Sequence, residues 1–426
     1  MKRLAPLTAA LAVISVAPPA AAQAPGSPDR GFGRAGTVTI SHPFLELTPE
    51  LVAQRGGRIV VGARAHVPGG SAGSGFSFFR LLRDGRLDRR FGRRGRVDAD
   101  LPGASMGALL PDGGFAAARI REGAFLHGTL EVVRLTRSGA RDTAFGDGGL
   151  ATVALDFVAW PVALSAQPDG GLLVVTRTAT APGSSVVVLR LDPTGQVDAS
   201  FGSGGQVRLT GNGQVSGAEI AVRPDGRLIV AMVVDEPVAP THRLTLAAFD
   251  AQGRPDPSFG TDGSGVVSEP SGPAQPRGMA LGPGGRLGLA GSWASGRSDF
   301  AVWAYEPGGT RSVFKTPKTT AAAEDGYAIA FDRAGRMLLA GQIGGLVDFR
   351  GIAVARLGRT GRPDRRFGRR GLVLRRPPTP AGAEAIAVQR DGRVLVAGWQ
   401  LRGRNIRQGR FRRTDPGVIR LLRLNG

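Results

Sequence analysis

A nine-residue phrase occurs twice in this chain, as LDRRFGRRG at residues 87–95 and as PDRRFGRRG at residues 363–371. Alignment on the Phe of this phrase gives seven copies, and neighbouring copies lie 53 to 59 residues apart. The series consists of Phe32, Phe91, Phe145, Phe201, Phe259 and Phe367, with a weaker copy at Phe314. A period near 56 residues restricts the chain to a tandem array of small supersecondary units that pack on one another.

Three positions around the Phe repeat with it in six of the seven copies. An Asp lies three residues before the Phe, a Gly follows it directly, and a second Gly lies four residues after it. A second phrase, for example RPDGRLI at residues 223–229, repeats out of step with the first, and its Gly falls at positions 57, 113, 170, 226, 285, 335 and 392. Asp-Gly between two apolar runs predicts a tight β-hairpin, because Gly supplies the positive φ that the turn requires.

Each copy is predicted to form four short strands. In the fourth copy these strands cover residues 205–210, 217–224, 227–234 and 243–250. A single four-stranded sheet of this size cannot cover its own apolar faces, so the copies must pack together. The coils of a β-helix are much shorter than 56 residues, whereas four strands per unit is typical of a propeller blade.

The two chain ends favour a closed ring over an open array. An open array needs polar capping repeats, but this chain starts within one phrase at residues 27–40 and stops after an R-L-type strand at residues 418–426. The two ends are therefore two halves of one interrupted unit. We predict an all-β fold, a seven-bladed β-propeller built from four-stranded repeats and closed by pairing of the N- and C-terminal strands.

Composition agrees with this prediction. The chain contains 66 Gly and 30 Pro, and both residues disfavour helix interiors. It contains no Cys, which excludes disulfides, thiolate metal sites and the lipid-modified cysteine of a lipoprotein.

The amino terminus has the pattern of a secretory signal peptide. Lys2 and Arg3 precede an apolar stretch at residues 4–17, and small residues at 20–22 offer a cleavage site after Ala22. We therefore predict a signal peptide over residues 1–22, a short linker over 23–27 and a single propeller domain over 28–426. The predicted product is secreted or extracytoplasmic, monomeric and without a membrane span.

The joint pattern L-D-x-x-F-G-x-x-G-x-V, Q-P-D-G-x-L-x-V-A-G and V-x-R-L-x-x-x-G resembles the delta-60 repeat family over nearly all of the mature chain. Copies five and six depart from it, since Arg311 replaces the expected Asp, Lys315 replaces the Gly and Ala334 replaces the hairpin Asp. The resemblance implies an exported bacterial β-propeller of unassigned function. The family offers no catalytic motif to carry over.

The repeated residues themselves predict structure rather than chemistry. A catalytic residue is needed once, whereas this Asp occurs in six copies. Each repeated Asp is therefore expected to accept backbone N–H bonds in its own turn. The repeated Phe is expected to be a wedge between adjacent blades. The Arg that recurs at positions 80, 134, 190 and 356 is expected to face solvent or pair with a turn Asp. A ring of carboxylates for metal or acid–base chemistry is the alternative.

The sequence contains few candidate catalytic motifs. The four His residues (His42, His66, His127 and His242) do not cluster in the sequence, and GTDGSG at 260–265 lies on a repeat turn rather than between a strand and a helix. We therefore predict no catalytic, cofactor or metal residues and a non-catalytic propeller that binds a partner at the cell envelope. The alternative is an extracytoplasmic enzyme, lyase- or quinoprotein-like, with its site at the mouth of the central channel. Convergent His or carboxylate side chains there would favour the enzyme.

Charge is the remaining compositional signal. The formal net charge is +21, and all but three of the 55 basic residues are Arg. The Arg-rich phrases fall in the first or last blades, which are neighbours in a closed ring. One extended loop over residues 400–417 carries six Arg residues: Arg402, Arg404, Arg407, Arg410, Arg412 and Arg413. Arg forks bind phosphate or carboxylate groups, so this loop is the predicted polyanion-binding element. Genome-wide codon bias is the alternative source of the Arg excess. Nucleic acid is a poor partner for an exported protein, whereas an anionic envelope polymer or a protein is a reasonable one.

Overall fold

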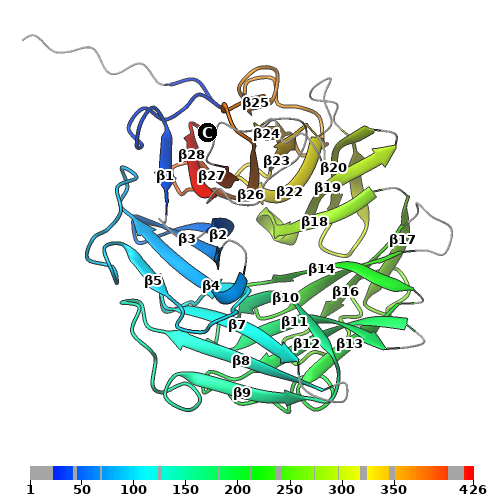
Figure 1. Cartoon of the computed structure of the whole chain (residues 1–426). Coiled ribbons are helices and arrows are strands. Elements are labelled where there is room, and N and C mark those ends of the chain that lie inside the picture. Colours follow the sequence, from blue (N-terminus) through cyan, green and yellow to red (C-terminus); the bar gives the residue numbers. More distant parts are fainter. Residues whose placement is uncertain are drawn as a thin grey trace, which may run out of the picture.

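The computed structural model describes residues 23–41, 46–67, 70–122, 127–180, 183–211, 213–235, 242–272, 274–295, 297–316, 324–344, 351–401 and 417–426. Within these residues the chain forms seven antiparallel four-stranded sheets, each in the order of a propeller blade. Figure 1 shows the sheets arranged in a ring, with β1 beside β28. The predicted all-β, seven-bladed propeller is confirmed.

Four sets of seven strands build the blades, from the centre outward. The innermost strands are β2 (Glu46–Arg55), β6 (Met106–Leu109), β10 (Ala159–Ala166), β14 (Gln214–Val222), β18 (Ala274–Leu281), β22 (Glu324–Phe331) and β26 (Ala381–Val388). The second strands are β3 (Arg58–Val67), β7 (Phe115–Glu122), β11 (Leu172–Thr180), β15 (Leu228–Asp235), β19 (Leu287–Ser295), β23 (Met337–Ile343) and β27 (Val394–Gln400).

The third strands are β4 (Gly70–Leu81), β8 (Gly128–Leu135), β12 (Gly183–Leu191), β16 (His242–Phe249), β20 (Arg297–Tyr305), β24 (Gly351–Leu357) and β28 (Val418–Leu424). The outermost strands are β5 (Arg96–Asp98), β9 (Leu150–Leu155), β13 (Gln206–Thr210), β17 (Val266–Gly272), β21 (Arg311–Lys315), β25 (Leu372–Arg375) and β1 (Thr37–Ile40). A 3-10 turn over Pro283–Gly285 joins β18 to β19.

Blades and sequence copies are offset by one strand. The first strand of the fourth sequence copy, residues 205–210, corresponds to β13, which is the outermost strand of the preceding sheet β10-β11-β12-β13. Each outermost strand therefore comes from the next copy along the sequence. We number the blades 1 to 7 from the sheet that begins with β2 to the sheet that contains β26.

The ring closes in blade 7, where the two chain ends pair. Strand β1 is antiparallel to β28, with Thr37 opposite Leu422 and Ile40 opposite Ile419. The turn that joins the third and fourth strands in other blades is here completed by two chain ends. The Gly26 N–H donates to the Asn425 carbonyl at 2.7 Å, as the Gly195 N–H donates to the Asp192 carbonyl within blade 3. Each innermost strand also contacts the innermost strand of the next blade all the way around, including β2 with β26.

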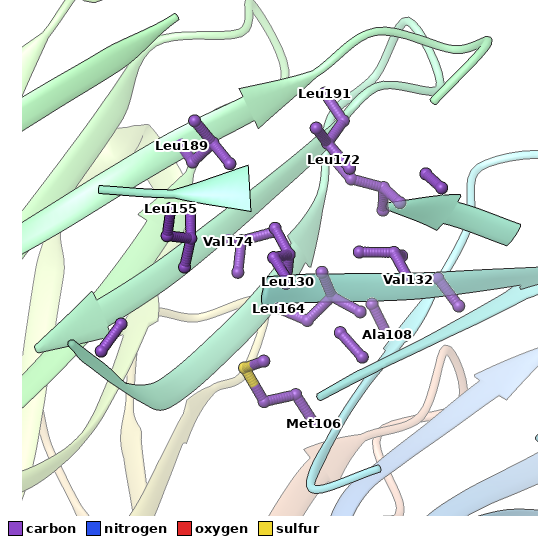
Figure 2. Close-up of a cluster of buried hydrophobic side chains, with 14 of the residues drawn as sticks. Met106, Ala108, Leu130, Val132, Leu155, Leu164, Leu172, Val174, Leu189 and Leu191 are labelled. Carbon is purple, nitrogen blue, oxygen red and sulfur yellow. The ribbon is translucent and has the colours of Figure 1, made fainter. Parts of the chain in front are cut away.

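The apolar core lies between neighbouring blades. Side chains of blades 2 and 3 interdigitate in one cluster, shown in Figure 2, which contains Met106, Leu130, Leu155, Leu164 and Leu172. The six turn Phe side chains are at most 1% exposed and each lies in a cluster of this kind, which confirms that they are wedges between blades. In blade 5, however, Phe314 lies within β21 rather than in a turn before it. Arg311 and Lys315 replace the Asp and Gly on which that turn depends elsewhere.

Candidate functional site

The repeated Asp and Arg residues form structural pairs in the turns before the outermost strands, which we call the rim turns. In each rim turn one Asp carboxylate oxygen accepts the backbone N–H two residues on, as Asp88 does from Arg90 at 3.2 Å. The second oxygen pairs with the recurrent Arg, as in Arg80–Asp88 at 3.0 Å, and the guanidinium of that Arg lies over the turn Phe. The prediction that the Asp caps its turn and the Arg pairs with it is confirmed.

Five rim turns share this Arg–Asp–Phe arrangement. The Arg–Asp pairs are Arg80–Asp88, Arg134–Asp142, Arg190–Asp198, Arg356–Asp364 and Arg423–Asp29. Blade 4 has Ala248 in place of the Arg, and its Asp256 pairs instead with Arg227 at 3.5 Å. Although burial raises the pKa of Asp88, the Arg90 N–H and the charge of Arg80 lower it overall. These carboxylates are satisfied and carry no sign of catalysis.

A cavity of about 670 Å³ occupies the central channel. All seven innermost strands contribute to its lining, together with Arg64 from β3. One side is polar and comes from blades 1 and 4 to 7, with Glu50, Glu219, Arg277, Tyr327 and Glu384. On the opposite side, blades 2 and 3 contribute residues 106–109 and 162–166, of which only Ser165 has a polar side chain, although Met106, Ala108 and Leu164 are largely buried in the core between these blades.

A β-bulge aims one side chain of each of five innermost strands into this channel. The register of β26 against β27 shifts between Ala383 and Ala385, which leaves Glu384 as the extra residue. The same shift isolates Glu50, Val162, Arg277 and Tyr327, and all five bulge residues line the cavity. Bulges commonly re-aim side chains next to functional sites. In blade 4 the bulge lies at Ser216, and Glu219 from the regular part of β14 lines the cavity.

Neighbouring side chains orient the polar residues of the channel. The Trp399 Nε1–H donates to Glu384 Oε1 at 2.9 Å, and the Gln342 amide donates to the Tyr327 hydroxyl at 3.0 Å. Arg64 pairs with Glu50 across adjacent strands. The Arg277 guanidinium lies 5.2 Å from the Tyr327 ring centroid. Within the described part of the chain, Arg277 forms no ion pair, although its charge acts on Glu384 and opposes the rise in the pKa of that carboxyl.

Two channel carboxyls have pKa values near or above neutrality. Burial raises the pKa of Glu384 to about 7, and the negative charge of Glu50 adds to this, while the Trp399 hydrogen bond opposes it. Burial alone raises the pKa of Glu219 to about 8. Burial likewise raises the pKa of Tyr327 to about 12, so its hydroxyl keeps its proton at neutral pH. Groups whose proton affinity is tuned to neutral pH are typical of functional sites.

The sequence did not predict these channel residues. Four of them occupy one column of the repeat, eight residues before the hairpin Gly, where Val162, Arg277, Tyr327 and Glu384 differ in type. Glu50 and Glu219 lie seven residues before it. The sequence signal that could have identified them is the change of residue type at one position of an otherwise regular repeat. Convergent carboxylates in the channel are the feature expected of the alternative, an enzyme with its site at the channel mouth, rather than of a non-catalytic propeller.

The predicted polyanion loop, Arg402 to Arg413, lies outside the described residues, as do the predicted signal peptide and His42. In blade 4, His242 Nδ1 lies 2.8 Å from Asp235 Oδ1, and His242 does not line the channel cavity. GTDGSG forms part of a rim turn, as expected. Among the residues with assigned positions, no group of three or more His, Asp or Glu side chains is arranged to hold a metal ion. The same residues contain no helix that is long and apolar enough to cross a bilayer.

A family match supports the propeller architecture. A family described as a β-propeller domain of unknown function (DUF5122) matches residues 167–201, which run from the hairpin of blade 3 to its rim turn. No curated protein sequence matches the chain significantly. Among solved structures, a gluconolactonase from Xanthomonas campestris is 13% identical, with 91% of this chain and 99% of that chain covered and a TM-score of 0.37. The β-propeller domain of the Trilobed protease from Pyrococcus furiosus is 10% identical, with 89% and 98% covered and a TM-score of 0.43. The chain is a β-propeller repeat protein.

Proposed function

We propose that this protein is an extracytoplasmic β-propeller that binds a small organic anion with an apolar part in its central channel. The observation that carries the proposal is the two-sided lining of the 670 Å³ cavity, with an Arg277 that forms no ion pair among the described residues. Cavities of a few hundred cubic ångströms with an apolar wall and a few convergent polar groups are typical ligand sites.

The charges of the channel specify the ligand. Arg64 is paired with Glu50. At neutral pH the raised pKa keeps Glu219 largely protonated, and Glu384 is about half protonated. Arg277 is left as a positive charge, which favours a carboxylate or phosphate on the ligand. The protonated carboxyls and the Tyr327 hydroxyl can donate hydrogen bonds to it, while blades 2 and 3 contact its apolar part.

Location outside the cytoplasm is supported by the predicted signal peptide over residues 1–22. The resemblance to the delta-60 repeat family agrees with export. The proposal keeps the protein in the class of envelope or secreted binding proteins.

The test is calorimetric titration of the protein with small carboxylates and phosphates that differ in their apolar parts. Replacement of Arg277 by Gln should weaken binding of a positive probe roughly tenfold or more, because hydrogen bonds to charged groups contribute about 1.5–3 kcal/mol. Arg254→Gln is the matched control, since Arg254 is exposed on the outer part of blade 4 and does not line the channel. Equal binding by the two variants would show that the channel is not the site.

A second candidate function rests on Glu384. A carboxyl with a pKa of about 7, held by the Trp399 N–H and exposed to the channel, suits proton transfer to or from a bound substrate. If Glu384 is a general acid, turnover should fall as the pH rises above about 7. If it is a general base, turnover should rise over the same range. Glu384→Gln should remove turnover and leave ligand binding in place, whereas a pure binding protein shows no turnover in either form.

A further inference from the structure

Three rim turns on consecutive blades carry an unusual amount of positive charge. These are residues 364–371 of blade 6, 29–36 of blade 7 and 88–95 of blade 1, and we call them the basic rim. Ten Arg side chains occupy positions in these turns, and all ten are exposed. None of the ten has a carboxylate within ion-pair distance among the residues that the structure describes.

The same positions on the other side of the ring carry no basic residue. In the rim turns of blades 2, 3 and 4 the equivalent residues are small or neutral, apart from Asp147 and Asp262. The turns share one backbone design, so the fold does not require Arg there. The charge is therefore confined to one sector of the ring, which a uniform codon bias does not explain.

Two of these arginines occupy strained backbone positions. Arg94 and Arg370 have φ values of 54° and 55°, in the left-handed region that side chains with a Cβ rarely adopt. Blades 2 and 3 place Gly148 and Gly204 at this position, with φ values of 57° and 62°, and a Cβ added to either glycine would meet open space. The Arg side chains therefore extend into solvent at an energetic cost that Gly avoids. Gly codons are as rich in G and C as Arg codons, so codon bias does not favour Arg at these positions.

A groove continues the basic rim beside the chain ends. Its volume is about 900 Å³, and it lies between residues 24–28 of the N-terminal segment and residues 368–376 of blade 6. Arg369, Arg370, Arg375 and Arg376 line it, and its lining contains no Asp or Glu. Its position joins the charged turn of blade 6 to that of blade 7.

We propose that the basic rim and this groove bind an extended anionic polymer, with successive acidic groups on the arginines of blades 6, 7 and 1. A single small anion could occupy only one turn, whereas the charges cover three consecutive blades. Planar guanidinium groups bind carboxylate, sulfate or phosphate groups bidentately. Arg94 and Arg370 place charge on the polymer path at a left-handed position where Gly would avoid strain, and the uncharged Ala35 shares this backbone in blade 7 with a φ of 51°.

A polymer fits this surface better than an anionic membrane does. Peripheral membrane binding normally adds apolar side chains that enter the bilayer. Among the described residues two large hydrophobic side chains are exposed. Leu87, which is 38% exposed, directly precedes the blade 1 turn, and Trp160 lies on blade 3, outside the basic rim. A groove also suits a chain better than a flat lipid surface. The predicted export of the protein makes an anionic polysaccharide the expected polymer.

The experiment measures binding of the exported chain to heparin, as the polysaccharide probe, over a range of salt concentrations. Arg94→Gly with Arg370→Gly should weaken binding about tenfold at low salt and should leave the melting temperature equal or higher, because Gly relieves the left-handed strain. Arg208→Gln with Arg254→Gln removes the same charge from blades 3 and 4 and should change binding by less than about twofold. Binding by the wild type should weaken as salt rises, because exposed charge contacts are screened.

Further variants and probes distinguish binding by the rim charges from a change in turn structure, from membrane binding and from binding by the loop that contains Arg402 to Arg413. Arg93→Ser with Arg369→Ser removes charge at unstrained positions, so a loss of heparin binding there shows that charge, rather than a change in the turn, is responsible. The proposal is overturned if the rim variants bind heparin as well as the wild type, or if the control pair weakens binding equally. It is also overturned if only anionic vesicles, and not heparin, bind the protein. If replacement of Arg402 to Arg413 by Ser removes binding while the rim variants keep it, the loop is the site and the rim is not.

Discussion

The rim turns and the central channel use charged residues in opposite ways. In the rim turns the same Arg–Asp pair recurs from blade to blade. Although burial raises the pKa of Asp29, Asp88 and Asp364, backbone hydrogen bonds and neighbouring Arg charges lower it overall. In the channel the charged residues differ from blade to blade, and burial favours the protonated form of Glu219 and Glu384. Repetition with satisfied partners therefore indicates structure in this protein, and variation with raised pKa values indicates a site.

Among the changes that test the structural role of the rim turns, removal of the N-terminal strand should lower the stability of the protein most. Deletion of residues 28–40 removes β1, the buried Phe32 and the Asp29 carboxylate that pairs with the buried Arg423 at 2.6 Å. We expect a loss of roughly 6–10 kcal/mol, since a large buried aromatic and a broken buried ion pair each cost about 3–5 kcal/mol. Thermal melting followed by circular dichroism measures it. Unchanged melting would contradict closure of the ring through blade 7.

Truncation of a wedge should be next in size. Phe201 is fully buried between blades 3 and 4. Phe201→Ala should lower the free energy of unfolding by roughly 3–5 kcal/mol, the range for a large core aromatic. Chemical denaturation measures the loss. Phe314→Ala in blade 5, where the rim turn is absent and Phe314 is only partly buried, should cost less. An equal cost at the two positions would contradict the wedge role of the turn Phe.

Loss of a turn carboxylate should have a smaller effect. Asp198 accepts the Ser200 N–H at 3.1 Å and pairs with Arg190 at 3.2 Å. Asp198→Ala should cost about 1 kcal/mol, as for a lost cap. Denaturation at pH 7 measures this cost, and Asp198→Asn, which keeps an acceptor for the N–H bond, should recover part of it. If Asp198→Ala instead abolished binding of a metal ion, the structural role of the rim carboxylates would be wrong.

The smallest expected effect is the dependence of stability on pH in the channel. The folded-state pKa of Glu219 is about 8, above its ordinary value of 4.5, so the stability linked to its proton is present below pH 4.5 and is lost as the pH rises through 8. Glu219→Gln cannot ionise, and it should be more stable than the wild type at pH 9 by a few tenths to about 1 kcal/mol, since channel water screens part of the shift.

The stability linked to Asp88 should depend on pH in the opposite direction to that linked to Glu219. Its pKa is lowered from 3.8 in the folded state, so the stability that it contributes is present above pH 3.8 and is lost as the pH falls through its folded value. Asp88→Asn should therefore be less stable than the wild type at pH 7, and the difference should shrink in strong acid. If the stabilities of Glu219→Gln and Asp88→Asn relative to the wild type changed with pH in the same direction, the proposed difference between channel and rim carboxyls would be wrong.

The repeated part of the structure was predictable from the sequence. The Asp-Gly hairpin at Asp225 and Gly226 and the strands around it lie within two or three residues of their predicted bounds, because a positive φ and period-2 patterning are local properties. The turn role of the repeated Asp was predictable for the same reason. The channel residues were not, since a bulge that turns Glu384 or Arg277 inward depends on pairing with the next strand.

The number of units, their internal turns and the closure of the ring were predictable from the sequence, because each of these is repeated or completed by a repeated pattern. Which single residues of the seven blades face one cavity became clear only in the folded ring, whereas the predicted closure of the ring already placed the Arg-rich blades side by side. The physical reason is that a ring brings equivalent positions of distant copies together. The repeat specifies where those positions lie, and the assembled ring determines which of the side chains there meet.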